Sequence, residues 1–154
     1  MWLAPSVTDI RQARPEDVES VRTVVRAAFA PYLERMDREP APVLDDYAAL
    51  VEAGEVWVAT QGEDVLAVVT LRIEEGVALL GTLAVRRALA GVGLGSRLLS
   101  WAEGHARAEG CTEVRLYTNV AMTENLAWYP RRGYEETERG RVDGYDRVQF
   151  SKSL

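Results

Sequence analysis

The chain contains very little cysteine, histidine and lysine. Its 154 residues include one cysteine, Cys111, and one histidine, His105. A single cysteine excludes an intrachain disulfide framework, and one cysteine with one histidine argues against a zinc site built from such ligands. Lys152 is the single lysine, so 17 of the 18 basic residues are arginine. The sequence by itself offers no physical reason for this bias.

The sequence also lacks a long hydrophobic run. No stretch approaches the roughly 18 uncharged apolar residues of a membrane-spanning helix. The N-terminus does not combine a basic segment with an apolar one as a secretory signal does. We therefore expect a cytoplasmic protein with no membrane partner. Hydrophobic residues at 47% and charged residues at 27% are ordinary for a globular chain, and the length predicts one domain, 1–154.

The charge of the chain is negative and unevenly distributed. The formal net charge is −6, which disfavours nucleic acid as a partner because proteins that bind phosphate backbones usually carry a basic surplus. Residues 34–64 hold nine acids and two bases, so this segment alone accounts for the whole surplus. Such a run is commonly a solvated face. It would also suit an entrance that attracts a cation.

Hydrophobic periodicity predicts both helices and strands, with three strands forming an antiparallel meander. Glycines 140 and 144 are expected to join the last two strands. The expected ranges, in chain order, are strand 7–13, helix 15–30, loop 31–43, helix 44–53, strands 56–60, 65–73 and 77–85, helix 94–110, strand 114–118, helix 124–132, and strands 134–138 and 145–150. This order predicts an α+β fold with a mixed sheet and helices on its faces.

A stretch of alternating glycines precedes the long helix. Gly91, Gly93 and Gly95 lie where the helix begins. Glycine permits tight turns and close approach of a ligand to the main chain, and the first amides of a helix form an anion site suited to phosphate. A tight turn without a ligand fits the same spacing. A P-loop requires a lysine, and the dinucleotide fingerprint requires G-x-G-x-x-G, so neither motif matches.

Two segments together resemble the Gcn5-related N-acetyltransferase (GNAT) family. Residues 83–96 are similar to the family's coenzyme A loop, R/Q-x-x-G-x-G/A, and residues 117–134 are similar to its second signature, N-x-x-A-x-x-x-Y-x-x-x-G-F/Y. They occur in the family's order and separation, and the resemblance extends from Val7 to Phe150. It implies a mixed, mostly antiparallel sheet of about seven strands flanked by about four helices.

The resemblance implies an N-acetyltransferase that uses acetyl-CoA as co-substrate and needs no metal. A primary amine, either a small cationic amine or a peptide or protein amine, would attack the acetyl group directly in a ternary complex. Acetyl-CoA would lie where the strands at 77–85 and 114–118 splay apart. The family's main-chain contacts would come from Leu83, Ala84 and Val85 for the pantetheine arm, and from Gly91, Val92, Gly93, Leu94, Gly95 and Ser96 for the pyrophosphate.

Tyr129 occupies the position of the family tyrosine that lies near the CoA sulfur. The implied role is a general acid that protonates the departing thiolate. The residue is otherwise a core aromatic on a short helix. A base must also deprotonate the attacking amine, and Tyr117, Tyr32 or a water relay are the open options.

The chain departs from the family pattern at three positions. Ala90 replaces the Arg or Gln that opens the phosphate loop, which removes a side chain but no main-chain donor. Met122 replaces the family asparagine, and Asn125 or Asn119 is expected to substitute for it at the cofactor. Pro130 directly follows the tyrosine and is expected to end the helix early.

The acceptor is expected to meet residues 30–47. An aromatic and acidic pocket there would bind a cation, and its candidate residues are Tyr32, Asp37, Asp45, Asp46 and Tyr47. A hydrated lid is the competing interpretation.

We expect a monomer or homodimer. The alternatives to an enzyme are a catalytically weak or inactive acyl-CoA-binding module of the same fold, and a nucleotide-binding protein, which the lack of a loop lysine disfavours.

Overall fold

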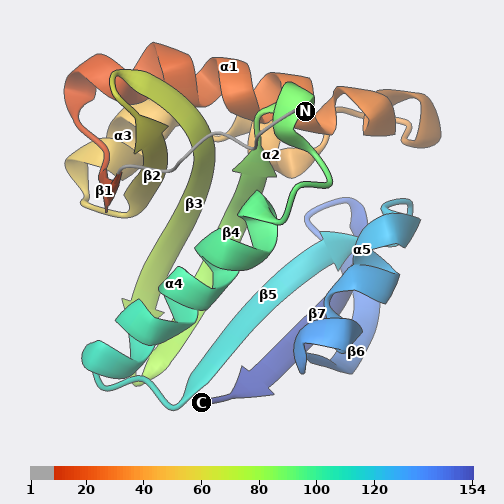
Figure 1. The fold of residues 1–154 in the computed structure, drawn as a ribbon. Helices are drawn as coiled ribbons and strands as arrows, with labels where there is room; N and C mark the ends of the chain where they lie inside the picture. Colours follow the sequence, from red (N-terminus) through yellow and green to blue (C-terminus); the bar gives the residue numbers. More distant parts are fainter. Residues whose placement is uncertain (1–8) are drawn as a thin grey trace. The chain divides into compact units, whose positions relative to one another are not determined.

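The computed structural model describes residues 9–154, and it divides into two compact units (Figure 1). The described part of the first unit is 9–71 and 82–102, and the second unit is 72–81 and 103–154. The strands are β1 (Asp9–Gln12), β2 (Val56–Gln61), β3 (Asp64–Glu74), β4 (Val77–Val85), β5 (Glu113–Asn119), β6 (Glu135–Val142) and β7 (Tyr145–Ser153). They are hydrogen-bonded in the order β1-β2-β3-β4-β5-β7-β6.

Within the described residues, five α-helices and four short 3-10 helices connect these strands. The α-helices are α1 (Val18–Phe29), α2 (Ala41–Leu44), α3 (Tyr47–Glu52), α4 (Leu94–Ala108) and α5 (Thr123–Trp128). The 3-10 helices are η1 (Pro15–Asp17), η2 (Ala30–Arg35), η3 (Arg87–Leu89) and η4 (Pro130–Arg132). The predicted α+β class and sheet of seven strands are confirmed, and the strand predicted at 77–85 agrees with β4 to the residue. The described part contains five α-helices where about four were expected.

The segment predicted as an irregular loop, 31–43, contains most of η2 and the first turn of α2. The helix predicted from residue 44 begins only at Tyr47, because the Asp46 carboxylate accepts a hydrogen bond from the Ala49 amide at 3.1 Å and caps α3. Residues 7 and 8 of the predicted first strand lie outside the described residues.

The turn between the last two strands differs from the prediction. Gly140 lies inside β6, and the reversal is made by Asp143 and Gly144 alone, with φ of 52° and 82°. Two consecutive positive φ values define a type I′ turn, whose twist matches that of the flanking strands. β6 is exposed along its whole length, and its charged side chains protect the edge of the sheet from pairing with another chain.

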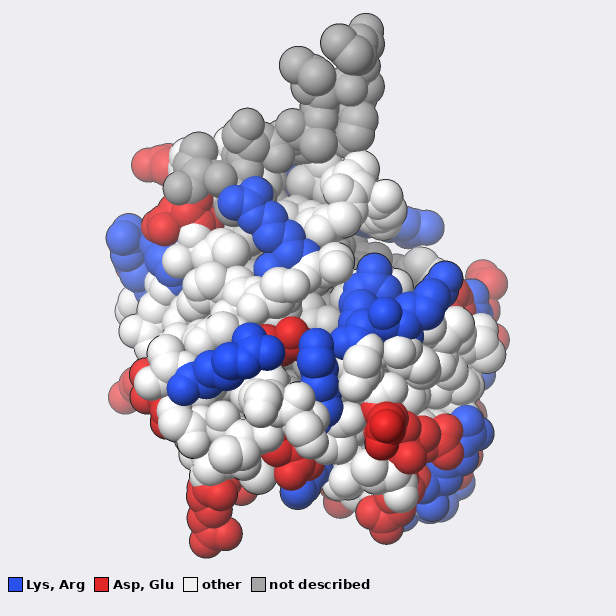
Figure 2. All heavy atoms as spheres, turned by 60° about the horizontal axis from the view of Figure 1, so that its bottom comes forward, with Lys and Arg blue, Asp and Glu red and all other residues white. Residues whose placement is uncertain are grey.

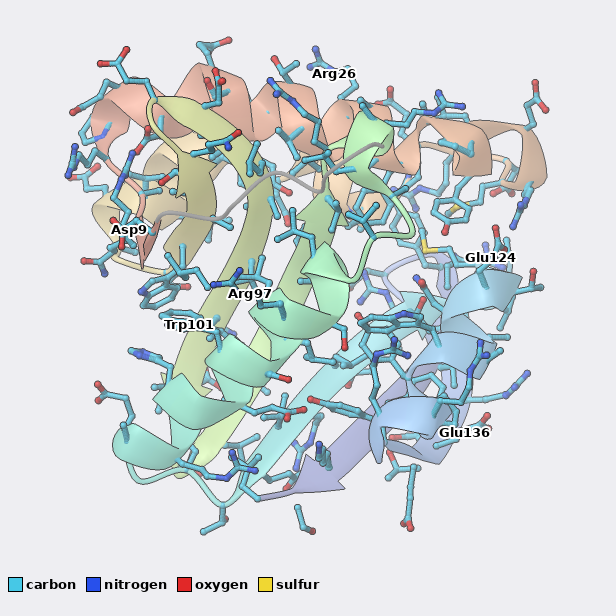
Figure 3. The ribbon with its side chains drawn as sticks, in the orientation of Figure 1. Asp9, Arg26, Arg97, Trp101, Glu124 and Glu136 are labelled. Carbon is cyan, nitrogen blue, oxygen red and sulfur yellow. The ribbon has the colours of Figure 1, made fainter. Side chains whose placement is uncertain are left out.

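The core of the first unit is built around β3. This strand is buried without interruption from Val65 to Leu71, so it reads as a continuous apolar run rather than an alternating one. α1 contacts both α2 and α3. Trp101 of α4, labelled in Figure 3, packs against Trp57 of β2 with ring centroids 5.8 Å apart.

The second unit has a smaller core on one face of its strands. β5 pairs in parallel with β4 over Val77–Leu80 and antiparallel with β7 along its whole length. Every second residue of β5 from Val114 to Thr118 is buried, and Val148 and Phe150 are buried on β7. The alternation means that one face of these strands packs inward and the other carries polar side chains.

The surface carries charges of both signs. Figure 2 shows acidic and basic side chains on the same face, with uncharged surface between them. Within residues 9–154, none of the helices is both long enough and apolar enough to cross a membrane.

Candidate functional site

The glycine loop in the first unit adopts the conformation that its sequence requires. Gly91 and Gly93 have φ of +85° and +87°, in the left-handed region that other residues enter only at a cost. A Cβ atom added to either glycine would meet nothing within 4 Å. The backbone conformation, and not crowding, therefore demands glycine, and the space around the loop is open to a ligand.

The loop leads directly into α4, a helix of 15 residues. The Arg97 amide donates to the Gly93 carbonyl at 3.1 Å, which is the first backbone bond of the helix, and Figure 3 labels Arg97 on it. The amides of Leu94, Gly95 and Ser96 lie in the turn before that bond, where helix amides point outward along the axis. Together with the positive end of the helix macrodipole, they provide what an anionic phosphate group needs.

The end of β4 and the residue after it are hydrogen-bonded to β3. The Thr82 amide donates to Thr70 Oγ1 at 2.9 Å, and the Arg86 amide donates to the Leu66 carbonyl at 2.8 Å. Because main-chain groups alternate direction along a strand, the N–H and C=O groups of Leu83 and Val85 face away from β3. The edge that they form is suited to main-chain hydrogen bonds with an extended ligand. Ala84, between them, has its side chain buried at 2% exposure.

Tyr129 lies in the second unit at the junction of two short helices. α5 ends at Trp128, and Pro130 begins η4, so the early helix end expected from Pro130 is confirmed. The Tyr129 carbonyl accepts hydrogen bonds from the amides of Arg132 (2.9 Å) and Tyr134 (3.2 Å), and its own amide donates to the Asn125 carbonyl at 3.1 Å. The backbone around the tyrosine is therefore held on both sides.

The Tyr129 ring is 6% exposed and lies among three other rings. Its centroid is 5.0 Å from that of Trp128 and 5.5 Å from that of Tyr134, both edge-on, and 5.9 Å from that of Phe150. Aromatic pairs prefer such edge-to-face geometry. The ring is thus placed by packing.

The residues expected to replace the missing family asparagine have local partners. Met122 is buried at 4% exposure. The Asn125 Nδ2 group donates to Thr118 Oγ1 at 3.2 Å and contacts Met122 Sδ at 3.7 Å, which ties α5 to β5. Asn119 Oδ1 accepts from the Ala121 amide at 2.9 Å and stabilises a turn. A cofactor contact from Asn125 remains a prediction.

Tyr117 lies on β5, and its side chain is exposed. The guanidinium carbon of Arg147 is 5.7 Å from its ring centroid and 5.3 Å from that of Tyr145. Strand alternation points Tyr117 to the opposite face from Thr118, the residue that Asn125 contacts. Its proposed role in proton removal is not tested by this placement.

The five candidate acceptor residues have different surroundings, all within the first unit. The Tyr32 ring packs against Phe29 at 6.0 Å and has the Arg35 guanidinium 5.2 Å from its centroid, so it already pairs with a cation of the chain. Asp37 and Asp45 are exposed, as is Asp46, which caps α3.

Tyr47 is 1% exposed and joins the acceptor segment to β4. Its hydroxyl donates to the Pro42 carbonyl at 2.6 Å and lies 3.5 Å from Thr82 Oγ1. Burial raises the pKa of the Tyr47 phenol well above its ordinary value, so the hydroxyl remains a donor at neutral pH. Thr82 directly precedes Leu83, and no sequence signal marked it, because only the fold brings residues 47 and 82 together.

Replacing Tyr47 by phenylalanine is expected to lower the free energy of unfolding by about 1 kcal/mol, because the partly buried Pro42 carbonyl loses its hydroxyl donor while the ring stays in place. Urea unfolding followed by circular dichroism measures the change. A Thr23→Val variant removes an exposed hydroxyl that donates to the Glu19 carbonyl, and we expect a smaller loss. Equal losses for the two variants would contradict the role of Tyr47 as a buried anchor.

Comparison with known proteins decides the family. The sequence profile of the acetyltransferase (GNAT) family matches residues 18–134, a span that includes the glycine loop and Tyr129. The chain belongs to the GNAT acetyltransferase family. Membership in this GNAT family supports acetyl transfer as the general reaction. No curated protein matches the chain significantly.

Solved structures confirm the GNAT fold. The chain is similar to PaiA N-acetyltransferase from Thermoplasma acidophilum in complex with coenzyme A (19% identity, TM-score 0.78, 95% of this chain and 98% of that chain). It is also similar to the ribosomal-protein-S18-alanine N-acetyltransferase of Escherichia coli (17%, 0.76, 95% and 93%). A third is Arabidopsis thaliana Naa50 in complex with the bisubstrate analogue CoA-Ac-MVNAL (19%, 0.70, 95% and 98%). At these identities the likeness concerns the fold alone.

Proposed function

We propose that the protein is an acetyl-CoA-dependent N-acetyltransferase acting on a primary amine. The observation that carries the proposal is the open glycine loop at the N-terminus of α4, within a chain that belongs to the GNAT family. We further propose that both units form one acetyltransferase domain, because the family match extends across both.

The residues of the first unit fit coenzyme A. The loop amides from Gly91 to Ser96 would hold the pyrophosphate, since they combine outward N–H groups with the helix dipole. The main-chain edge of Leu83 and Val85 would hold the pantetheine arm and the acetyl carbonyl. Ala90 leaves these main-chain donors in place. Among residues 9–154, no group of three His, Cys, Asp or Glu side chains is placed to hold a metal ion, and the proposal requires none.

The chemistry needs one group to remove a proton and one to supply a proton. Acetyl-CoA supplies an activated acyl group when bound. The acceptor amine must be deprotonated before attack, because an alkyl ammonium has a reference pKa of about 10.4, and Tyr117 or a water beside it is proposed for that step. A phenol hydroxyl can act as a proton donor, and that of Tyr129 would donate its proton to the departing thiolate.

We propose a cationic amine as acceptor, drawn to the acidic residues of the segment 30–47. Replacing Asp37 and Asp45 together by asparagine is expected to raise KM for a cationic amine about 3- to 10-fold at low salt and by less at high salt, because salt screens exposed charges. Initial rates across an amine panel measure this effect. The matched control is a Glu63→Gln, Asp64→Asn double variant in the β2–β3 turn, which removes the same charge outside residues 30–47. An equal rise in both variants, or a neutral or anionic amine as the best acceptor, would contradict the proposal.

Thiol release from acetyl-CoA across the same panel separates the enzyme from its alternatives. An enzyme releases thiol in proportion to acetylated amine. Tight CoA binding without turnover on any amine would favour the inactive acyl-CoA-binding module. Thermal stabilisation by a nucleotide but not by acetyl-CoA would favour a nucleotide-binding protein.

A further inference from the structure

The only lysine in the sequence belongs to a polar network in the second unit, in which the Lys152 side chain is 25% exposed. Lys152 Nζ donates to both carboxylate oxygens of Glu103, at 3.1 and 3.2 Å, and to the Arg132 carbonyl at 2.9 Å. The Tyr134 hydroxyl donates to the same carboxylate at 2.8 Å. Glu103 is 7% exposed and Tyr134 is 2% exposed. Buried charges persist when they are paired and hydrogen-bonded, as these are.

The network joins three parts of the chain that are distant in sequence. Glu103 lies on α4, Lys152 lies on β7, and Arg132 ends η4. Burial and the hydrogen bond to Glu103 raise the pKa of the Tyr134 phenol, so its hydroxyl remains a donor. The Lys152 ammonium thus holds the C-terminal end of η4 directly, through the Arg132 carbonyl.

The chemistry of the site explains why this basic residue is a lysine in a chain that otherwise uses arginine. A compact ammonium directs its three N–H donors to separate acceptors, whereas a guanidinium is a larger planar fork. Gly133 has φ of +91°, and a Cβ added to it would lie 3.2 Å from Lys152 Cε. The lysine stem therefore packs closely against the Gly133 backbone, where little room remains for a larger head group.

The same short segment carries Tyr129. The Tyr129 carbonyl accepts from the amides of Arg132 and Tyr134, which are the two residues that bracket Gly133. The Tyr134 ring, fixed by its bond to Glu103, meets the Tyr129 ring edge-on at 5.5 Å. On the other side of η4, the Arg132 guanidinium stacks 3.8 Å from the Trp128 centroid. The residues of the network therefore contact both the backbone and the ring of Tyr129.

We propose that Lys152, Glu103 and Tyr134 are positioning residues that hold η4 in place and so set the position of the Tyr129 hydroxyl. The inference rests on the proposed function, in which Tyr129 donates a proton to the thiolate. None of the three needs to touch the substrates. Their effect on turnover should therefore pass through Tyr129, which distinguishes positioning from a general contribution to stability.

A double-mutant cycle tests the proposal. Tyr134→Phe keeps the ring against Tyr129 and removes only the hydroxyl, and Lys152→Met removes the ammonium. Each is expected to lower kcat about 3- to 10-fold well below its melting temperature, with KM values within about 2-fold, since a small displacement of a catalytic group reduces rate more than binding. In a Tyr129→Phe background, neither should lower kcat further. A decrease of the same factor in both backgrounds, or an unchanged kcat, would overturn the proposal.

The control is Arg139→Met, which breaks the exposed pair with Glu136 at 2.8 Å on β6, where Figure 3 labels Glu136. We expect kcat to stay unchanged in this variant. Lys152→Met is expected to lower Tm by roughly 5–10 °C, because it leaves a buried carboxylate unpaired.

A second readout does not depend on turnover. With ¹³C-labelled tyrosine, the Tyr129 resonance should shift or broaden in Lys152→Met and not in Arg139→Met. An unchanged resonance would overturn the proposal even if acetyl transfer is observed. A wild-type protein without turnover on any amine would instead contradict the proposed function, while the resonance would still show whether the network positions Tyr129. If Lys152→Met does not fold, Tyr134→Phe carries the kinetic test.

Discussion

Replacing Tyr129 by phenylalanine is expected to lower kcat about 100-fold, because general acid catalysis by a positioned side chain typically contributes that much or more. KM for acetyl-CoA should change less than about 2-fold, since the proposed contacts to the cofactor come from the main chain of the first unit. The loss in kcat should be greatest for acyl donors whose thiol is a poor leaving group, because departure of such a thiolate depends most on protonation. Steady-state thiol release with acetyl-CoA and the best amine of the panel measures both constants.

The Tyr129→Phe substitution removes the hydroxyl without changing the packing of the ring. The Tyr129 ring meets Trp128, Tyr134 and Phe150, and phenylalanine keeps all three contacts. The matched control is Tyr145→Phe, which removes another buried phenol hydroxyl of the second unit and should leave kcat near the wild-type value. An unchanged kcat in Tyr129→Phe would mean that the thiolate leaves without this proton donor.

Replacing Gly93 by valine is expected to weaken CoA binding about 10- to 100-fold. Gly93 has φ of +87°, and a β-branched residue in that region is strained. A valine would either force the loop to change shape, so that the first turn of α4 loses its alignment, or place its methyl groups where the ligand approaches. Isothermal titration with CoA measures the dissociation constant directly.

The control for Gly93→Val is a glycine inside α4 that has no positive φ. Gly104→Ala adds a Cβ that meets nothing within 4 Å, and alanine favours a helix over glycine by about 1 kcal/mol. We expect this variant to bind CoA like the wild type and to be slightly more stable. Similar weakening of CoA binding in the two variants would contradict a pyrophosphate site at Gly93.

The folded chain follows its sequence most closely where a local pattern decides the structure. β4 agrees with the predicted strand at 77–85, and Pro130 ends α5 as expected, because strand periodicity and a missing amide act within a few residues. The agreement fails where a choice depends on one capping bond or one turn. Asp46 delays the start of α3, and Asp143 with Gly144 moves the last turn away from Gly140.

The candidate site also contains some features that the local sequence predicts and others that depend on tertiary contacts. The sequence predicts the glycine loop because its proposed function resides in the main chain, and glycine is the residue that main-chain sites require. The acceptor residues were less evident. In the sequence, Asp46 and Tyr47 are simply part of an acidic and aromatic segment. In the structure, the buried Tyr47 hydroxyl donates to the Pro42 carbonyl, and Asp46 caps the N-terminus of α3. A side chain's role depends on its partners, which composition does not reveal.

The sequence by itself determined the α+β class, the phosphate-type loop and the tyrosine at the end of a short helix, because each rests on spacing within one segment. Only the tertiary structure brought Glu103, Tyr134 and Lys152 together from residues up to 49 positions apart. It also explained the single lysine, which remained an unexplained bias in the composition. The physical reason is that a buried ion pair is stable only with all its partners present, and folding alone brings those partners together.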